Sequence, residues 1–371
     1  MKFRIPSGDI VRGLSAVIGA VPNKATLPIL EDVLFEAEGS TLKLTATDLE
    51  IYMVQTVEAD ISEDGKVAIP ARRLLDTIRQ LPDIPVTFDV DERNNIRFKT
   101  DKGTYKLAGN AADDFPASPS LEESNAIISK AEHLKEAIQK TSFAVASDDL
   151  RPAMMGVYFQ IGSESSKVVA TDGRRLARLE TSNIVGEQEM SFIVPEKALN
   201  LVQKSLGNGE CSVSVSADHA RFETGSTIVI TRLINDQYPN YESVIPREND
   251  KTMKVAKDDM IATVKRVSIF SSSTTKQIRL ELKANEVEIC AEDVDMSSEA
   301  KESVPCEYGA DEMVIGFNAR YLSDVLGNVT GSDVVFEFST PNRAGIVRPA
   351  EQNENEDMLM LVMPVMLNTY A

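Results

Sequence analysis

Two pairs of acidic side chains stand close enough in the sequence to do chemistry: Asp48 with Glu50, and Asp293 with Asp295. Carboxylates in such pairs can share a proton in acid–base catalysis or bind Mg²⁺. A third aspartate, Asp172, stands in a similar sequence, and the three aspartates are 124 and 121 residues apart. The same acidic corner therefore recurs at about one domain length. Recurrence favours a role in capping a turn, because an active site would more naturally occur once.

Other catalytic and metal-binding patterns are scarce. The two histidines, His133 and His219, fall in different repeats, which favours neither a histidine triad nor a histidine-rich metal site. The three cysteines form no CxxC pair, and the sequence has no glycine-rich phosphate-binding loop. We therefore expect no catalytic residues, no metal and no cofactor, and a reducing, cytoplasmic compartment.

A threefold repeat positions the acidic corners. Each repeat has a strand, a turn, a second strand and the corner, over residues 26–53, 150–180 and 275–302. A short strand and an amphipathic helix precede each segment, and another short strand and helix follow it. The sequence predicts an α+β fold of three similar domains in series, each with two helices and about eight strands. The expected domains are 1–124, 125–250 and 251–371, and three in series suggest an arc or ring segment.

Charge separates the predicted helices from the rest of the chain. The net charge is −19 over 371 residues, which argues against a surface that binds nucleic acid or anionic lipid on all sides. The six predicted helices together carry +5, which leaves −24 elsewhere; they span 7–19, 71–81, 130–141, 196–206, 257–269 and 318–326. On the second helix, Arg72 and Arg79 lie opposite the apolar side chains. Basic helices gathered on one side would hold duplex DNA by its phosphates, without reading its sequence.

Two further features concern the ends of the chain. The N-terminus lacks the apolar core of a signal peptide, and no apolar run is long enough to span a membrane, so we expect a soluble protein with no membrane partner. The methionine-rich run from Met358 to Leu367 is either the last strand of the third domain or one wall of a partner-binding cleft. The residues alone leave both interpretations open.

Seven motifs follow one another along the chain: TLPIL from Thr26, TATDLE from Thr45, DDFP from Asp113, ATDGRRLA from Ala170, YPNY from Tyr238, IGFNARYL from Ile315 and VMPV from Val362. In order and spacing they resemble the bacterial DNA polymerase III beta sliding clamp family, and the resemblance covers essentially the whole chain. It implies a non-enzymatic processivity factor of DNA replication. In that family two chains join head to tail as a homodimer, and their domains form a closed ring around duplex DNA with the helices lining the hole.

The resemblance also implies site residues and partners. Lys24 and Arg151 match loop positions that touch DNA, and the helix argument adds Arg72, Arg73 and Arg79. The family's pocket receives short hydrophobic peptides from the DNA polymerase III catalytic subunit, the clamp loader, other polymerases and repair proteins. The matching positions here are Met154, Thr171, Gly173, Arg174, Arg175, Leu176, Pro239, Val244, Leu361, Val362, Met363, Pro364 and Val365. This sequence departs from the family's pattern in two places: Glu242 and Ser243 replace a basic pair of well-known members, and Asn368 to Ala371 extend past their usual end. The resemblance therefore does not fix the preferred peptide.

Closure of a head-to-tail ring would join the first domain to the third. Arg97, Lys99, Lys102 and Lys106 make one end basic, and acidic residues that include Glu299 and Glu302 line the other. Tyr105 and Leu107 on one side, with Ile269 and Phe270 on the other, match the family's apolar seam. The alternative is that these charges only protect exposed sheet edges. Two rival functions, a three-domain enzyme and a peptide-binding scaffold without a DNA role, explain the repeats and the basic helices less well.

Overall fold

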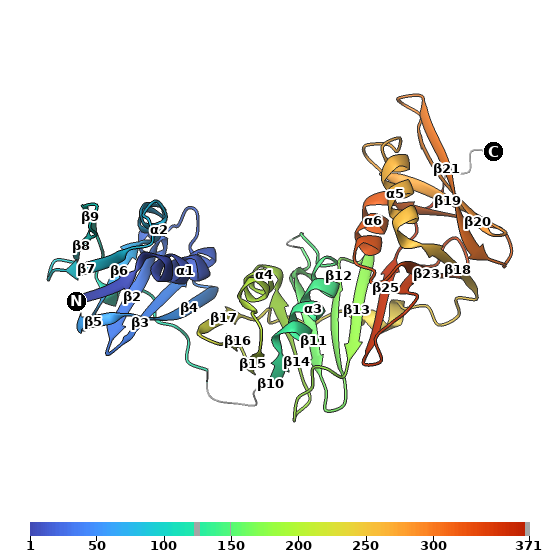
Figure 1. Ribbon diagram of the computed structural model, residues 1–371. Helices are drawn as coiled ribbons and strands as arrows, with labels where there is room; N and C mark the ends of the chain where they lie inside the picture. Colours follow the sequence, from blue (N-terminus) through green and yellow to red (C-terminus); the bar gives the residue numbers. More distant parts are fainter. Residues whose placement is uncertain (122–126, 149, 368–371) are drawn as a thin grey trace. The chain divides into compact units, whose positions relative to one another are not determined.

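The computed structural model describes residues 1–121, 127–148 and 150–367 of the chain (Figure 1). These residues form two compact units, one built from 1–135 with 197–233 and the other from 136–196 with 234–371. The predicted boundary at residues 124 and 125 and the extension from Asn368 lie outside the described residues. None of the described helices is long and apolar enough to cross a membrane.

The first unit contains two antiparallel sheets. The order in one is β5-β1-β7-β8-β9, and in the other it is β10-β15-β16-β17-β4-β3-β2-β6. The strands are β1 (Lys2–Pro6), β2 (Asp32–Glu38), β3 (Thr41–Thr47), β4 (Ile51–Glu58), β5 (Asp60–Glu63), β6 (Gly65–Pro70), β7 (Pro85–Val90), β8 (Asn95–Lys99), β9 (Thr104–Ala108), β10 (Ile127–Lys130), β15 (Glu210–Val215), β16 (His219–Thr224) and β17 (Thr227–Arg232). Strict alternation of buried and exposed residues, as in β8, gives each sheet one core face.

The second unit is organised by a twelve-stranded sheet, in the order β14-β11-β12-β13-β25-β24-β23-β18-β21-β20-β19-β22. Its strands are β11 (Gly156–Ile161), β12 (Ser166–Thr171), β13 (Arg175–Thr181), β14 (Met190–Pro195), β18 (Lys251–Ala256), β19 (Gln277–Lys283), β20 (Glu286–Asp293), β21 (Ser298–Tyr308), β22 (Met313–Asn318), β23 (Asp333–Phe338), β24 (Gly345–Pro349) and β25 (Glu356–Val362). The neighbouring strands β13 and β25 come from chain segments far apart in the sequence (Figure 1).

Six α-helices occur in the described residues, two in each repeat. They are α1 (Ser7–Val17), α2 (Ala71–Arg79), α3 (Ala131–Ser142), α4 (Glu196–Ser205), α5 (Lys257–Ser268) and α6 (Ala319–Gly327). Helix α2 shows how the pattern works: Leu74, Leu75 and Ile78 are buried, while Arg72 and Arg79 are exposed. Helices α1 and α2 pack together in the first unit, and α5 and α6 do so in the second. These elements confirm the predicted α+β class and the predicted helices to within three residues at either end.

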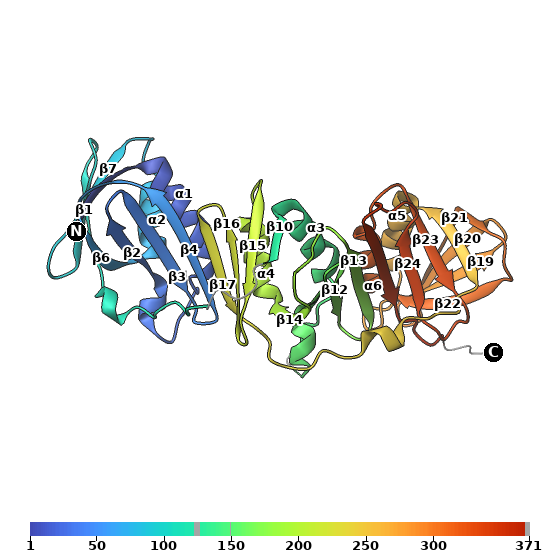
Figure 2. The same cartoon turned by 90° about the horizontal axis from the view of Figure 1, so that it is seen from below.

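The strand orders reveal the repeat directly. One sheet of each repeat runs β1-β7-β8-β9, β10-β15-β16-β17 and β18-β23-β24-β25, and the other runs β6-β2-β3-β4, β14-β11-β12-β13 and β22-β19-β20-β21. Strand β17 of the second repeat pairs with β4 of the first, as Figure 2 shows, and β13 of the second pairs with β25 of the third. The two compact units divide the second repeat because its two sheets are hydrogen-bonded to different neighbours.

Candidate functional site

The acidic corners are hydrogen-bonded turns in all three repeats. The carboxylate of Asp48 accepts hydrogen bonds from the backbone N–H groups of Glu50 (3.1 Å) and Ile51 (2.8 Å). The carboxylate of Asp172 likewise accepts from the N–H groups of the residues two and three positions further along the chain, at 2.8 and 2.9 Å. The carboxylate of Asp293 does the same at 3.1 and 3.2 Å. The corner aspartates therefore cap turns, as their recurrence predicted. The Oδ1 atom of each aspartate accepts both of these bonds, which gives the three carboxylates the same structural role.

The second corner differs from the first in its central residue. Gly173 has a φ of +80°, and Leu49 holds the equivalent place in the first corner with the same φ. A Cβ atom on Gly173 would lie 2.7 Å from the Nη1 atom of Arg151, whose guanidinium donates a 2.7 Å hydrogen bond to the carbonyl of Asp172. Glycine adopts this conformation without the strain that Leu49 bears, and a larger residue at position 173 would have to displace the Arg151 guanidinium.

Arg175 is the most strongly held charged side chain at this corner. It is buried, and its guanidinium makes ion pairs with Asp172, at 3.3 Å, and with Asp324 of α6. The guanidinium carbon also lies 5.5 Å from the centre of the Phe143 ring and 5.2 Å from that of Tyr321. Planar stacking and paired carboxylates suit arginine in a buried site better than lysine. Arg175 therefore ties the corner, α6 and the end of α3 into one rigid structure.

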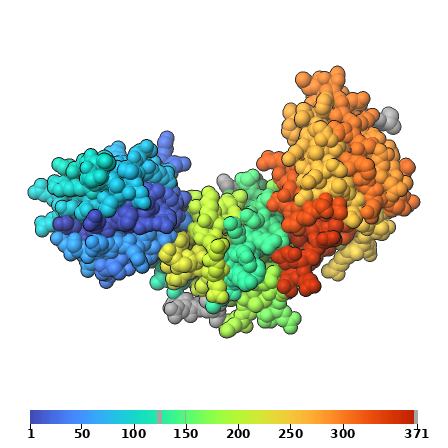
Figure 3. All heavy atoms as spheres, viewed as in Figure 1, coloured from blue at the N-terminus to red at the C-terminus, as the bar shows by residue number. Residues whose placement is uncertain are grey.

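The C-terminal strand continues the sheet beside this corner. Arg175 pairs with Val362 and Leu176 with Leu361, so β25 follows β13 along its whole length. The space-filling view shows the red C-terminal segment against the green surface of the second repeat (Figure 3). Beyond the strand, the N–H of Met363 donates to the carbonyl of Arg174 (2.8 Å) and that of Val365 to Gly316 (2.9 Å). The run after Val362 is therefore fixed by its backbone, which leaves its side chains available.

A hydrophobic cluster lies under the corner and the C-terminal strand. Its buried members are Ala153, Val169, Leu176, Ile193, Tyr238, Tyr241, Ala344, Ile346, Leu359 and Leu361. Tyr238 stacks on Tyr158 with ring centres 4.6 Å apart, and burial raises its pKa, so it stays protonated at neutral pH. The Tyr241 hydroxyl donates to Gln160 at 2.5 Å. The YPNY motif had marked these tyrosines, but only the structure places them with β13 and β25.

The predicted peptide-site residues fall into two layers, all within the second unit. A buried layer consists of Thr171, Arg175, Leu176, Leu361 and Val362. A layer that solvent reaches consists of Met154, Gly173, Arg174, Pro239, Val244, Met363, Pro364 and Val365. Val244 is 53% exposed and Met363 is 40% exposed, which is unusual for side chains of this size. The sequence prediction thus mixes the support of the site with its surface. It missed Asp324, Phe143 and Tyr321, since no local pattern links them to Arg175.

The predicted DNA-contact residues are all exposed, but they differ in how their side chains are engaged. Arg72 donates to the carbonyl of Val21 (3.0 Å) and Arg79 to the hydroxyl of Ser15 (2.9 Å). Arg151 is the most engaged, because it also pairs with Asp148 at 2.6 Å. Lys24 and Arg73 have no side-chain hydrogen bond or ion pair within the part of the chain that the structure describes. These two cations are therefore the most available to phosphates.

The residues of the predicted seam lie at sheet edges and a helix end. Tyr105 and Leu107 belong to β9, the edge strand of its sheet, and the Tyr105 ring stacks on Phe98 at 4.8 Å. Ile269 and Phe270 follow α5 and are 78% and 41% exposed. Lys99 and Lys102 are exposed, as is Glu299, while Glu302 pairs with Arg266 at 2.5 Å. Two exposed apolar side chains in succession at a helix end form a candidate contact surface.

One group of side chains has the composition of a metal site. Glu281, Glu288 and Cys290 lie within ligating distance of one another on β19 and β20. Arg279 and Lys283 already neutralise the two carboxylates. Burial raises the pKa of the Cys290 thiol to about 11, so the sulfur is protonated at neutral pH. This chemistry does not favour a metal ion, because the carboxylates are already paired with cations and a metal would need the thiolate.

Comparison with known proteins accounts for this arrangement. Three family models match in series: the N-terminal, central and C-terminal domains of the DNA polymerase III beta subunit, over residues 1–119, 129–240 and 242–366. The chain belongs to this family. A curated relative, the beta sliding clamp of Pseudomonas aeruginosa, is 32% identical over 99% of this chain and 100% of the relative. The beta sliding clamp of Vibrio cholerae is 29% identical over the same shares.

Solved structures of beta subunits agree with the fold. A crystal structure of the DNA polymerase sliding clamp of Pseudomonas aeruginosa with a ligand has a TM-score of 0.94 at 32% identity, and covers 99% of this chain and 100% of that one. A beta sliding clamp of Caulobacter crescentus, with polyethylene glycol bound to a putative tethering region, has a TM-score of 0.90 at 28% identity over the same shares. The predicted family and the three-domain α+β class are confirmed. The beta subunit is a non-catalytic processivity subunit, so membership also agrees with the expectation that the chain is not an enzyme.

Proposed function

We propose that this chain is a sliding clamp that closes around duplex DNA as a head-to-tail homodimer and tethers its partners through the corner beside β25. Family membership carries the clamp function. The way in which edge strands pair between repeats supports the closed ring. Strand β4 of the first repeat pairs with β17 of the second, and β13 of the second pairs with β25 of the third. The third repeat has the corresponding strand, β21, and the first has the corresponding edge, β9.

In the described residues the outer edge of β9 has no strand partner, and the corresponding edge of β21 is unpaired before Cys306. Strand β9 lies at the end of its sheet, and β21 meets β18 only at Cys306, Glu307 and Tyr308. An open strand edge is a template for pairing with another chain. If β21 of one copy pairs with β9 of a second copy, the pattern of the two internal junctions is repeated between copies. The number of two copies in the ring is what the resemblance to the family implies.

The internal junctions also predict the register of that seam. Every repeat has an alanine two residues before its corner aspartate. This alanine faces Met53 in the first repeat, Ala177 in the second and Ala300 in the third. Met53 pairs across its junction with Val229, and Ala177 with Met360. The residue of β9 that corresponds to Val229 and Met360 is Tyr105, by its place in the strand order. Tyr105 of one copy is therefore expected to face Ala300 of the other.

This register brings opposite charges together. With Tyr105 opposite Ala300 in an antiparallel pair, the next pair is Lys106 with Glu299. Both side chains are exposed and point to the same face of their strands. A one-residue slip would remove this match and turn the apolar residues to the wrong face. The Lys106–Glu299 pair thus favours this register over its one-residue neighbours.

Ile269 and Phe270 supply a test of the seam. Replacing both with serine removes apolar surface that closure would bury, which is worth several kcal/mol at about 25 cal/mol per Å². Because both are exposed in the single chain, its fold is expected to survive. The matched control is I128S/V314S, which alters two other exposed apolar residues away from these edges. By analytical ultracentrifugation, I269S/F270S should be monomeric at micromolar concentration and the control dimeric. A dimeric I269S/F270S would place the seam elsewhere.

Retention on DNA tests the clamp function itself. A ring held by topology stays on circular duplex DNA and leaves linear duplex from its ends, whatever the sequence. We propose that Lys24, Arg72, Arg73, Arg79 and Arg151 contact phosphates inside this ring. Gel filtration of loaded circles before and after cutting measures the effect. Equal loss from circular and linear DNA would contradict the proposal.

The exposed layer at the second corner is the proposed tethering site for partners. Its apolar residues Met154, Val244, Met363 and Pro364 suit a short hydrophobic peptide, and methionine adapts to varied ligands. The proposed partners are the polymerase III catalytic subunit, the clamp loader, other polymerases and repair proteins, acting in the cytoplasm. Glu242 is exposed and pairs with Lys167 at 2.8 Å, so an acidic group borders this surface. We also propose domain boundaries near residues 124 and 250.

A further inference from the structure

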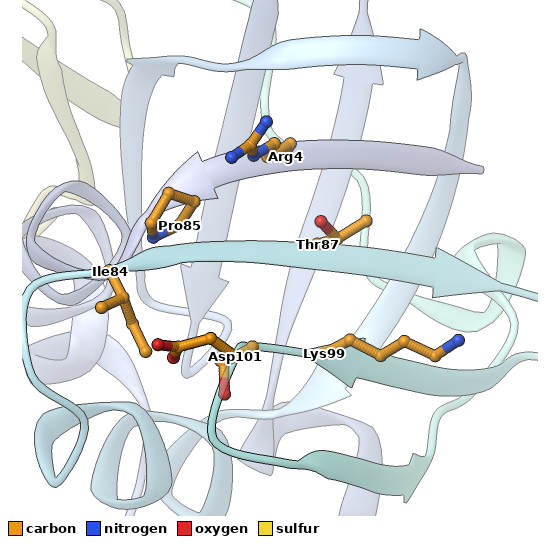
Figure 4. Close-up of a pocket in the computed structure, with 7 residues that line it drawn as sticks. Arg4, Ile84, Pro85, Thr87, Lys99 and Asp101 are labelled. Atoms are coloured by element: carbon orange, nitrogen blue, oxygen red, sulfur yellow. The ribbon is translucent and has the colours of Figure 1, made fainter.

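Two shallow pockets on the sheets differ in the charge of their surroundings. The first, of about 380 Å³, lies on the five-stranded sheet, and its lining mixes Arg4 and Lys99 with Asp101 (Figure 4). The second, of about 490 Å³, lies at the β14 edge of the twelve-stranded sheet, and we call it the edge pocket. Its lining consists of Gln160, Ile161, Gly162, Ser165, Lys167, Glu189, Met190 and Ser191. Of the two, the edge pocket has the surroundings that favour one sign of charge.

The edge pocket adjoins the proposed tethering site. A short 3₁₀ helix, Tyr241–Val244, connects the two surfaces. The Tyr241 hydroxyl donates to the Gln160 side chain of the pocket at 2.5 Å. Glu242 pairs with Lys167, also of the pocket, at 2.8 Å. Val244, at the end of the same helix, belongs to the exposed layer of the tethering site. The two surfaces therefore meet along one turn of the chain.

Strand β12 gives the distance between the two surfaces. Lys167 stands near the start of this strand, and Thr171, which supports the second corner, stands at its end. Four residues of β-strand span about 13 Å. An extended peptide that is held at the corner by its apolar residues therefore reaches the edge pocket with a side chain about four residues away.

Carboxylates outnumber cations around the edge pocket. Lys167 is the only cation of its lining, and the ion pair with the 3₁₀ helix neutralises it. Glu189 of the lining is exposed, and Glu180 lies directly opposite Lys167 on β13. Neither of these two glutamates has an ion pair in the part of the chain that the structure describes. Arg178, the next cation along β13, is already paired with Asp357. Two carboxylates without a cation therefore border one pocket.

We propose that the edge pocket binds a lysine or arginine side chain of a tethered peptide, about four residues from the apolar residues that occupy the corner. Ile161 and Met190 supply apolar surface for the stem of such a side chain, and Glu189 supplies the opposite charge. The hydroxyls of Ser165 and Ser191 can accept hydrogen bonds from its N–H groups. The lining thus matches each part of a long cationic side chain.

Glu242 keeps the pocket selective for a cation. Its ion pair with Lys167 leaves the pocket carboxylates to the peptide, and Lys167 holds the pKa of Glu242 below its usual value, so the pair persists at neutral pH. The inference rests on the proposed tethering function and adds to it the kind of peptide preferred, one with a basic residue beside its apolar residues. An acidic residue at the same place would meet Glu189 and be disfavoured.

The test compares two labelled forms of a hydrophobic polymerase-tail peptide that differ in one residue. One form carries lysine about four residues from the apolar residues, and the other carries glutamine there. Such a pair is made for each end of the peptide, and both pairs are titrated by anisotropy in about 50 mM salt, where an exposed ion pair is little screened. The E180Q/E189Q variant removes the pocket carboxylates. Its matched control, E164Q/E187Q, removes the same charge from two exposed glutamates that do not line the pocket.

At one end of the peptide, lysine should strengthen binding to the unaltered protein about fivefold over glutamine, the upper range for one exposed ion pair. E180Q/E189Q should bind the two forms equally, whereas E164Q/E187Q should keep more than half of the gain. No gain at either end, or an equal loss of the gain in the two variants, would overturn this inference alone, because the glutamine form would still bind at the corner. Absence of binding by both forms would overturn the tethering site, and this inference with it.

Discussion

The two junctions between repeats share a design and differ in chemistry. At the first, β4 leaves the corner of Asp48 and pairs with β17; at the second, β13 leaves the corner of Asp172 and pairs with β25. The first corner has Leu49, and the second has Gly173 with the buried Arg175 two residues on. The second junction alone is crossed by the chain beyond β25. The first junction therefore only joins two repeats. The second adds a glycine, a buried arginine and the chain beyond β25 to the same turn, and these make it a candidate site.

The largest difference between the junctions lies at Arg175. The R175A variant leaves Asp324 and Asp172 without their cation and removes the contacts to two aromatic rings. We expect the second unit to lose about 3 kcal/mol of stability, since breaking a buried pair costs that much or more. Urea unfolding followed by tyrosine fluorescence measures the loss. The neighbouring exposed Arg174 is the control, and R174A should change stability by less than about 0.5 kcal/mol. Equal effects would mean that Arg175 is not a support of the corner.

Removal of the chain after Val362 would make the second junction resemble the first. The backbone bonds from Met363 to Arg174 and from Val365 to Gly316 would be lost, together with the three candidate contact residues Met363, Pro364 and Val365. A hydrophobic polymerase-tail peptide that binds at micromolar strength should then bind at least thirtyfold more weakly, a loss of about 2 kcal/mol. Anisotropy measures the affinity, and sizing should show an unchanged dimer. Undiminished binding would move the site away from β25.

The DNA contacts sharpen the comparison, because one of them is held by the second corner. Arg151 is engaged by Asp148 and by the corner carbonyl of Asp172, whereas Lys24 and Arg73 are not engaged in the described residues. The K24Q/R73Q variant should weaken binding to duplex DNA about tenfold and flatten the salt slope by roughly 1.8, at 0.9 per contact. R151Q should have less than half that effect on the slope. An equal effect per residue would mean that Arg151 leaves the corner to meet DNA.

The smallest expected effect is the change in stability when the residue with positive φ at each corner is replaced. Leu49 occupies a left-handed conformation that costs a non-glycine residue about 1–2 kcal/mol. L49G should stabilise the first unit by up to about 1 kcal/mol, since the strain removed slightly exceeds the entropy that glycine loses on folding. G173L should instead destabilise the second unit, because its side chain also meets Arg151. Calorimetry measures the unfolding temperature of each variant. A rise in both variants, or a fall in both, would contradict this account.

The sequence predicted the periodic part of the molecule well. The helix pattern around Leu74, Leu75 and Ile78 and the recurrent aspartates depend on local spacing, so helices, repeats and capped turns could be predicted from the residues. The partners of Arg175 could not, because Asp324 lies 149 residues away and only the pairing of β13 with β25 brings α6 near the corner. The layering of the peptide site was missed for a similar reason. Leu176 and Val362 look like surface anchors in sequence, yet their strands pair over the cluster and bury them.

The pairing of β21 with β9 of a second copy is the central claim, and a disulfide tests its register most directly. Directly opposed residues of an antiparallel pair have Cα atoms about 4.5–5.5 Å apart, within the range that a disulfide requires. Cys306 of β21 is partly exposed, so the test is made in a C306S background, whereas the native Cys211 and Cys290 are buried. In this background K106C/E299C should form covalent dimers on oxidation, while each single variant should not. The oxidised dimer, loaded on circular duplex DNA, should stay on it in SDS and be released when the circle is cut. Absence of a crosslink, or a crosslinked dimer that leaves circular DNA as readily as linear DNA, would contradict the closed ring.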